Sequence, residues 1–154
     1  MRRLKQAALV FVVALAAAQL IRPDRTKPTT EESRAIRAHV GTASGLVAVL
    51  DRSCRDCHSN DTVWPWYTHV APVSWLMASA VTEGRKVVNF SEWGGYSDDE
   101  RRFLLSASCD AAQSGRMPGP WTWLHSEARL SPADIELICA AARQGEPHST
   151  GGAR

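Results

Sequence analysis

Five consecutive residues set the strictest condition on how this chain folds. Two cysteines lie three positions apart and a histidine follows directly, in the sequence Cys54-Arg55-Asp56-Cys57-His58. This CxxCH spacing suits covalent attachment of haem, because two thiols on one turn can each add to a vinyl group on the same edge of the porphyrin. We therefore predict that Cys54 and Cys57 hold one haem c and that His58 binds the iron.

Three other interpretations of the cysteine pair stay open at this stage. A thioredoxin-like redox pair needs a strand before it and a helix after it, and the neighbouring sequence lacks that pattern. A zinc site needs a second pair of ligands, whereas Cys109 and Cys139 are isolated cysteines that could only complete a scattered site. A structural disulfide between the two neighbours is the third.

The first 21 residues have the composition of a signal or membrane-anchor segment. Three basic residues at the start precede the run Ala7 to Ile21, in which Gln19 is the only polar residue. The run is shorter than the about 20 apolar residues that cross a bilayer, and residues 16–18 resemble a cleavage site. Cleavage, retention of residues 4–21 as an anchor, and a buried core helix all stay open. Because the basic residues come first, we expect export of the rest.

Composition and charge exclude several classes of protein. Hydrophobic residues make up 44% and charged residues 22%, which excludes a disordered chain, a collagen-like fibre and a multi-span membrane protein. The chain has 18 cations and 16 anions, and three of the cations lie in the N-terminal segment. The remainder is close to neutral, so no nucleic-acid partner is expected.

Helix signals recur along the rest of the chain, and no alternating strand pattern of useful length appears. We predict a linker over 22–30, a haem-binding domain over 31–146 and a disordered tail over 147–154. The predicted class is all-α, with about four or five short helices and long aromatic-rich loops after an N-terminal hydrophobic helix. The expected helices cover 31–39, 42–52, Pro72 to Gly84, 98–114 and a last one from Pro132 that ends before Gly145.

An electron-transfer haem usually has ligands on both faces, so a second ligand is needed. Met117 and Pro118 follow a predicted helix end, in a loop that can present a thioether to the far face. A thioether ligand favours ferrous iron and raises the reduction potential. We predict Met117 as the distal ligand and His125 as the runner-up, while ordinary gap-filling is the alternative for Met117.

All six tryptophans lie between positions 64 and 123, and several follow the cysteine pair closely. Wide flat side chains with polar tips suit the burial of a porphyrin, and side chains with N–H donors can hold its propionates. Core packing, solvated arginine and turn-forming asparagine are the ordinary alternatives. These predictions concern Trp64, Trp66 and Tyr67 as ring contacts and Arg85, Asn89 and Trp93 as propionate donors.

Cys109 and Cys139 each fall on the apolar stripe of a predicted helix. In an oxidising compartment a disulfide between the two helices is a reasonable expectation. Two separate buried thiols that pack as small hydrophobic groups are the alternative.

Longer stretches of the chain resemble a known family. CxxCHSN, WPWY, APVSWL and NFSEW occur in this order between Cys54 and Trp93, as in the bacterial haem-binding domain family of small c-type cytochromes. The segment SGRMPGPWTWLHSEARLSPADIELI is similar to a second part of the family, in which MP is the expected distal motif. The resemblance covers roughly residues 20 to 140, and QLIRP at 19–23 is similar to the family's junction after a membrane helix. No role for Cys109 and Cys139 is implied by the resemblance.

The sequence thus predicts an exported monohaem c-type cytochrome that carries single electrons between redox protein partners, on the periplasmic side of a bacterial inner membrane. It contains no recognisable nucleophile–base pair or carboxylate pair, which favours a carrier over a catalyst. The alternative is a peroxidase-like haem enzyme, or a gas or redox sensor, with an open or displaceable distal position. The third possible function is that of a structural or zinc-binding module that uses the cysteines and holds no haem.

Overall fold

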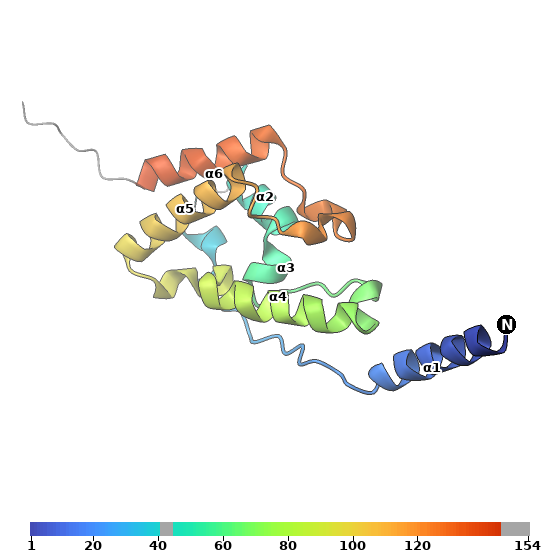
Figure 1. Cartoon of the computed structure of the whole chain (residues 1–154). Coiled ribbons are helices and arrows are strands. Elements are labelled where there is room, and N and C mark those ends of the chain that lie inside the picture. The colour runs from blue at the N-terminus through green and yellow to red at the C-terminus, as the bar shows by residue number, and fades with distance from the viewer. Residues whose placement is uncertain (41–44, 146–154) are drawn as a thin grey trace, which may run out of the picture.

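The computed structural model describes residues 1–40 and 45–145, and every regular element in these ranges is a helix. This confirms the predicted all-α class. Figure 1 shows α5 and α6 on one side of the domain, α4 on the opposite side, and α1 extending away from it. The α-helices are α1 (Arg2–Ala18), α2 (Leu46–Ser53), α3 (Arg55–His58), α4 (Val73–Val87), α5 (Asp98–Gln113) and α6 (Pro132–Gly145), and the 3-10 helices are η1 (Ile36–Ala38), η3 (Trp66–His69), η4 (Phe90–Gly95), η5 (Pro120–Trp123) and η6 (Ser126–Ala128).

The hydrophobic core lies where α2 meets α6 and η4. Leu46, Val49 and Leu50 recur at helical spacing, so they form one apolar face of α2. That face packs in one continuous cluster with Trp93 of η4 and Ile138 of α6. Because Cys54 follows α2 directly, this packing also fixes where the CxxCH motif begins.

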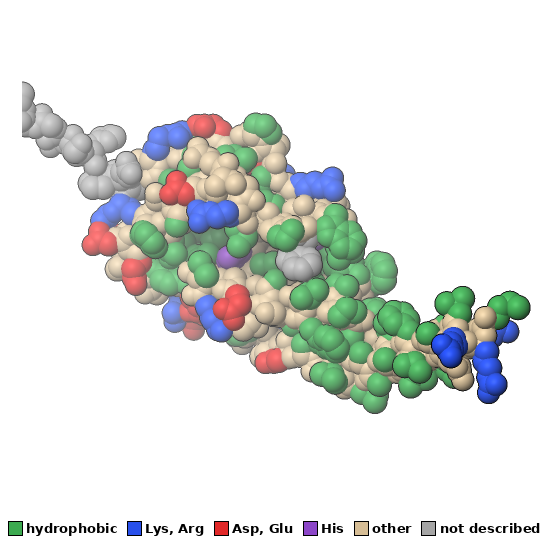
Figure 2. Space-filling model, viewed as in Figure 1, with side chains coloured by type: hydrophobic (Ala, Val, Ile, Leu, Met, Phe, Trp, Pro, Cys, Tyr) green, Lys and Arg blue, Asp and Glu red, His purple; other side chains and the backbone are tan. Residues whose placement is uncertain are grey.

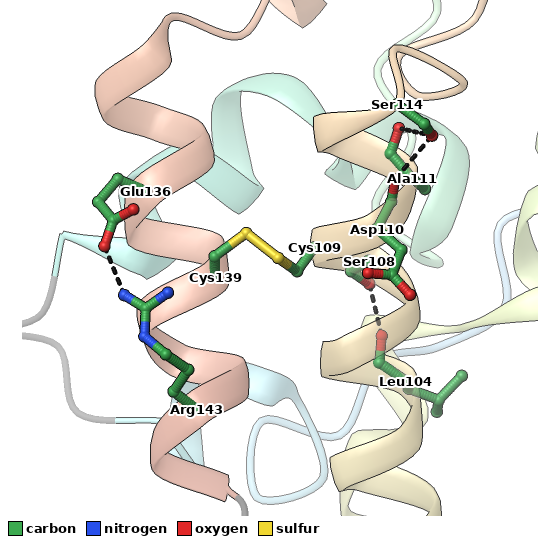
Figure 3. Close-up of a disulfide and its surroundings, with 9 residues drawn as sticks. All are labelled: Leu104, Ser108, Cys109, Asp110, Ala111, Ser114, Glu136, Cys139 and Arg143. Atoms are coloured by element: carbon green, nitrogen blue, oxygen red, sulfur yellow. Dashed lines mark hydrogen bonds and ion pairs between the residues drawn. A yellow bond between two sulfur atoms is a disulfide. The ribbon is translucent and has the colours of Figure 1, made fainter.

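A disulfide joins α5 to α6. The structure bonds the sulfurs of Cys109 and Cys139, whose Cα atoms are 4.8 Å apart (Figure 3). The Cys139 side chain is buried in the core between the two helices. A cross-link across 30 positions restricts the unfolded chain, and the chain-entropy model assigns it about 3.5 kcal/mol of stabilisation.

Reciprocal caps begin both cross-linked helices. The Ser97 hydroxyl accepts a hydrogen bond from the Glu100 N–H, and the Glu100 carboxylate accepts one from the Ser97 N–H. Ser131 and Asp134 repeat the pattern at α6, with bonds of 2.8 and 3.2 Å. These bonds satisfy N–H groups that the first turn of a helix leaves without partners. The predicted start of α5 is therefore confirmed.

The helix predicted over 31–39 is wrong. Only the short η1 forms there, because this segment makes contacts with more distant residues instead of a continuous helical ladder. The Arg34 carbonyl accepts a hydrogen bond from the Gly94 N–H at 2.8 Å. The Thr30 hydroxyl, which stands before the expected start, bonds to Asp61 and Ser91.

Other predicted boundaries are shifted or lie beyond the described residues. Of the helix expected over 42–52, residues 42–44 lie outside the described part, and α2 begins at Leu46. The tail expected over 147–154 also lies outside it. α4 continues past Gly84, where an end was predicted, and stops at Val87.

The N-terminal segment forms α1, and its apolar side chains are exposed. In residues 1–40 and 45–145, no helix combines the length and the apolar character needed to cross a membrane. The predicted linker over 22–30 has no regular structure, yet two of its backbone carbonyls accept hydrogen bonds from the domain, that of Thr26 from Arg85 and that of Thr29 from Asn60.

Candidate functional site

A cavity of about 210 Å³ lies between α3, α4, α5 and the segment 117–130. On the face shown in Figure 2, hydrophobic side chains surround a visible histidine. The structure brings five of the predicted site residues to this cavity: Cys54, Cys57, His58, Met117 and His125. Its wall is otherwise mostly apolar and includes Leu50, Met77, Val87, Val88, Phe90, Leu104, Ala112, Leu130 and Ile138.

The CxxCH motif occupies the junction between α2 and α3. Cys54 is both the C-cap residue of α2 and the N-cap residue of α3. Its carbonyl accepts a hydrogen bond from the His58 N–H at 3.0 Å. This single helical turn brings Cys54, Cys57 and His58 to the wall of one cavity. Both thiols are free of disulfide bonds.

The two thiols of the motif are kept in their neutral form. Burial, together with the neighbouring Cys57, raises the pKa of Cys54 to about 12. Burial and the carboxylate of Asp56 raise the pKa of Cys57 as well. A thioredoxin-like pair works through a thiolate of lowered pKa, so these shifts argue against the redox-pair interpretation.

His58 is oriented by two main-chain carbonyls at the end of α4, those of Gly84 and Val88. Its Nδ1 lies 2.9 Å from the carbonyl oxygen of Gly84 and 3.3 Å from that of Val88. Because a carbonyl can only accept, the proton belongs on Nδ1, and Nε2 keeps its lone pair for a metal. Burial lowers the pKa of His58, although both carbonyl bonds oppose that shift, so the imidazole favours its neutral, ligating form.

Gly84 allows α4 to approach the motif closely. A Cβ atom at this position would lie 2.5 Å from the backbone oxygen of Cys57, closer than real contacts permit. The absence of a side chain at Gly84 therefore allows α3 and α4 to pack closely, and this close packing brings the Gly84 carbonyl to His58. Sequence reasoning assigned it to a helix end, and only the distance between the two helices reveals this role.

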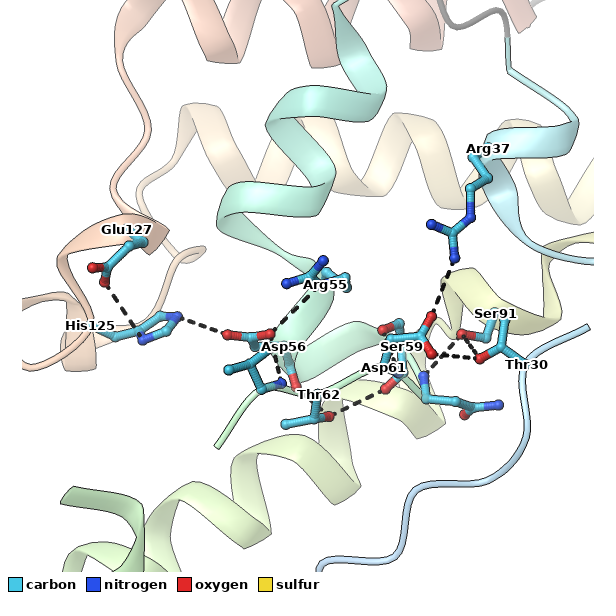
Figure 4. A network of polar contacts seen from close by, with 12 residues as sticks. Thr30, Arg37, Arg55, Asp56, Ser59, Asp61, Thr62, Ser91, His125 and Glu127 are labelled. Carbon is cyan, nitrogen blue, oxygen red and sulfur yellow. Dashed lines mark hydrogen bonds and ion pairs between the residues drawn. The ribbon is translucent and has the colours of Figure 1, made fainter. Parts of the chain in front are cut away.

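The two predicted distal candidates differ in their protein partners. Met117 follows α5, its N–H donates to the Ala111 carbonyl at 3.0 Å, and its side chain is half exposed at the cavity. In His125, Nδ1 lies 2.8 Å from the Tyr67 hydroxyl. Its Nε2 lies 3.4 Å from the Asp56 carboxylate (Figure 4). Both ring nitrogens of His125 thus face protein groups, whereas no hydrogen bond involves the Met117 side chain within the described residues.

The remaining predicted site residues lie around the motif and do not line the cavity. Trp64 stacks beneath the Arg25 guanidinium, Trp66 is exposed, and Trp93 is buried in the core. Their predicted contacts with a haem, and that of Tyr67, stay predictions.

Arg85 and Asn89 hold the chain just after the motif. The Arg85 guanidinium donates to the Ser59 carbonyl at 2.8 Å and to the Thr62 hydroxyl at 2.9 Å. The Asn89 side-chain amide donates to Asn60 Oδ1 at 2.9 Å. Both side chains therefore fix the loop behind His58, and their predicted role toward propionates also stays a prediction.

Sequence reasoning missed part of the cavity wall. Leu104, Ala107, Ser108 and Ala111 of α5 line it at helical spacing, and three of these four side chains are small. The repeated small residues on one face of a predicted helix were the available signal, since they leave room for a large neighbouring group.

The zinc interpretation has little support. Among residues 1–40 and 45–145, no three histidine, cysteine, aspartate or glutamate side chains are grouped to hold a metal ion. Cys109 and Cys139, which could have completed a scattered site, are bonded to each other.

Comparison with known proteins agrees with this geometry. A family model described as a haem-binding domain matches residues 13–144, which is most of the chain. No curated protein and no solved structure matches the chain. The matched range contains the motif, the whole cavity wall and the disulfide. The chain accordingly belongs to the haem-binding domain family.

Proposed function

We propose that this protein is an exported monohaem c-type cytochrome that carries single electrons between redox proteins. The observation that carries the proposal is the convergence of two free neutral thiols, an imidazole with its Nδ1 bonded to carbonyls, and a thioether at one apolar cavity. When bound, haem supplies an iron that takes up and releases one electron.

Each cavity residue has a definite task in this proposal. Cys54 and Cys57 would hold the haem covalently, and His58, through Nε2, and Met117 would bind its iron. The apolar wall excludes water, which limits the reorganisation that accompanies a change of charge. His125 connects the segment after Met117 to Asp56 inside the motif and to Tyr67 of η3.

The first test concerns attachment. The full chain is produced in a bacterium that has the cytochrome c maturation machinery, and the molecular mass of the denatured product is measured. We expect the mass of one haem in addition to the polypeptide, and colour that resists acid extraction. A colourless product, or a haem that is extracted freely, contradicts covalent attachment.

The second test concerns the distal ligand and has a matched control. Met117→Leu and Met77→Leu each remove one thioether from the cavity wall with little change in volume. We expect the near-infrared band of thioether-bound ferric iron to vanish in the first variant and to persist in the second. Loss of the band in Met77→Leu alone assigns the ligand to α4 and contradicts the role of Met117.

A second candidate function rests on the polar group beside the cavity. His125, held between Asp56 and Tyr67, could move protons at an open distal position, as a peroxidase-like enzyme or a gas or redox sensor requires. Rapid binding of carbon monoxide by the reduced unmodified protein favours this function. Slow or absent binding favours the electron carrier.

Location and partners complete the proposal. The basic start and apolar run of α1 direct the domain to the periplasmic side of a bacterial inner membrane, either anchored or released after cleavage. The partners are then redox proteins of that compartment. The mass of the N-terminal peptide of the exported protein separates the anchored form from the released one.

A further inference from the structure

The segment between α1 and the domain is fastened along one side of the domain. The Gln19 side chain bonds to both backbone groups of Ala71, with its Oε1 accepting the N–H at 2.9 Å and its Nε2 donating to the carbonyl at 3.3 Å. The Trp75 indole N–H donates to the Ile21 carbonyl at 2.8 Å. The end of α1 is thus attached to the residues that begin α4.

The attachment continues along the following residues. The Arg25 guanidinium donates to the Thr68 carbonyl of η3 at 2.5 Å and stacks over the Trp64 ring. The Thr26 carbonyl accepts from Arg85 at 2.9 Å. Residues 19–30 therefore hold α1 at a defined position beside η3 and the start of α4.

The same part of the domain exposes large apolar side chains. Residues 63–76 contain no Asp, Glu, Lys or Arg, although charged residues make up 22% of the chain. Four large apolar side chains of this stretch are between 44% and 79% exposed. Figure 2 shows hydrophobic side chains running from α1 onto the adjoining edge of the domain. The exposed residues of the stretch are Val63, Trp66, Val70 and Leu76.

We propose that residues 63–76 rest on a lipid bilayer surface, next to α1. The proposal rests on the anchored form of the proposed function, in which the N-terminal segment is retained, and adds a contact made by the haem domain itself. Three features point to lipid: the apolar helix α1 leaves the domain at this place, the stretch itself contains no Asp, Glu, Lys or Arg, and an exposed tryptophan suits the membrane interface.

The proposed contact borders one end of the cavity. Met77, which lines the cavity, follows Leu76 directly, and His125 of the wall bonds to Tyr67 of the stretch. Val87, another wall residue, lies eleven positions after Leu76 on α4, about 16 Å along the helix axis. The cavity wall therefore extends well beyond the part of α4 that would contact the membrane.

The test measures hydrogen exchange of the full-length haem-loaded protein with and without vesicles of phosphatidylethanolamine and phosphatidylglycerol. We expect slower exchange in peptides covering 63–76 and unchanged exchange in α5. Leu76→Glu should weaken vesicle binding about tenfold, because burying a charge in place of a leucine removes the apolar gain. Phe103→Glu is the matched control, since Phe103 is a 70% exposed apolar residue on α5.

Several results overturn the proposal. These are vesicle-bound protein with unchanged exchange over 63–76, an equal effect of Phe103→Glu and Leu76→Glu, and protection that rises with protein concentration in the absence of vesicles, which indicates a second copy. The proposal is also overturned if the N-terminal segment is found to be cleaved and vesicles do not slow hydrogen exchange over 63–76. Haem mass and absorbance, measured on the same samples, report separately on the proposed cytochrome function.

Discussion

The α5–α6 side of the domain and the CxxCH side are stabilised in different ways. The first has a disulfide, two reciprocal caps and, through α6, a share of the apolar core, although one face of α5 lines the cavity. The second surrounds a cavity, and its parts are connected by polar contacts such as those of His125 and Arg85. An apolar cavity forfeits dispersion and hydrophobic stabilisation until a group fills it. The comparison indicates that one side keeps its shape unaided, while the other gains its stability with the cofactor.

Loss of the proposed attachment points should have the largest effect. In the variant Cys54→Ala/Cys57→Ala we expect no covalently bound haem and a fall of at least about 4 kcal/mol in the free energy of unfolding, as for the loss of a tight ligand. Hydrogen exchange should accelerate around α3 and the segment 117–130 far more than in α5 and α6. Equal acceleration on both sides contradicts the comparison, and denaturant unfolding provides the overall free energy.

Loss of the disulfide should affect the opposite side. Cys109→Ala/Cys139→Ala is expected to reduce the free energy of unfolding by about 3.5 kcal/mol, because the unfolded chain regains its freedom. The mass and spectrum of the bound haem should not change, since neither cysteine belongs to the cavity wall. Urea unfolding and absorbance of the same sample check both statements. A shifted haem spectrum shows that the two sides are more tightly coupled than we infer.

Gly84→Ala tests the contact that positions His58. The new methyl group would meet the Cys57 backbone oxygen at 2.5 Å, so α4 has to move away from α3. We expect a loss of about 2 kcal/mol, typical of overpacking, and a raised or heterogeneous reduction potential, because an imidazole that loses the Gly84 carbonyl as acceptor is a less basic ligand and stabilises ferric iron less. The exposed Gly115, with no atom near its Cβ position, is a control for the spectrum when changed to Asn. An unchanged potential in Gly84→Ala contradicts the positioning role.

Local signals allowed much of the fold to be predicted. Ser97 and Glu100 mark the start of α5, because a capping box depends on residues three positions apart. Cys54, Cys57 and His58 were identified for the same reason, since their chemistry depends on spacing within one turn. The signals for Met117 were a helix end and a following proline, again within a few residues.

Features that depend on distant partners could not be predicted in this way. Thr29 and Glu32 also have capping-box spacing, yet long-range bonds of Thr30 and Arg34 replace the helix. Glycine is typical of helix ends, which led to the prediction for Gly84. The reason for a glycine at this position is instead the Cys57 backbone oxygen, which lies too close for a Cβ atom. The contacts of Arg85 and Asn89 with the loop at 59–62 likewise join residues more than 20 positions apart.

The smallest expected effect belongs to the cap of α6. Hydrogen bonds from the Ser131 N–H and hydroxyl, and then Arg52, hold the pKa of Asp134 below its usual value. A lowered folded-state pKa contributes stability above the pKa of the unfolded chain, and this stability is lost as the pH falls through the folded value. Ser131→Ala should therefore reduce the free energy of unfolding by about 1 kcal/mol at neutral pH and flatten its decline in acid.

The matched variant for this cap lies at the other side of the domain. Tyr67→Phe removes a hydroxyl that bonds to His125, and a single hydrogen bond contributes a similar free energy of about 1 kcal/mol. We expect Ser131→Ala to leave the haem absorbance unchanged and Tyr67→Phe to alter it, because only His125 borders the cavity. Thermal unfolding and absorbance, measured across acidic and neutral pH, distinguish the two variants. If both substitutions shift the haem absorbance equally, loss of a hydrogen bond at the α6 cap also alters the cavity. The two sides of the domain would then be structurally coupled.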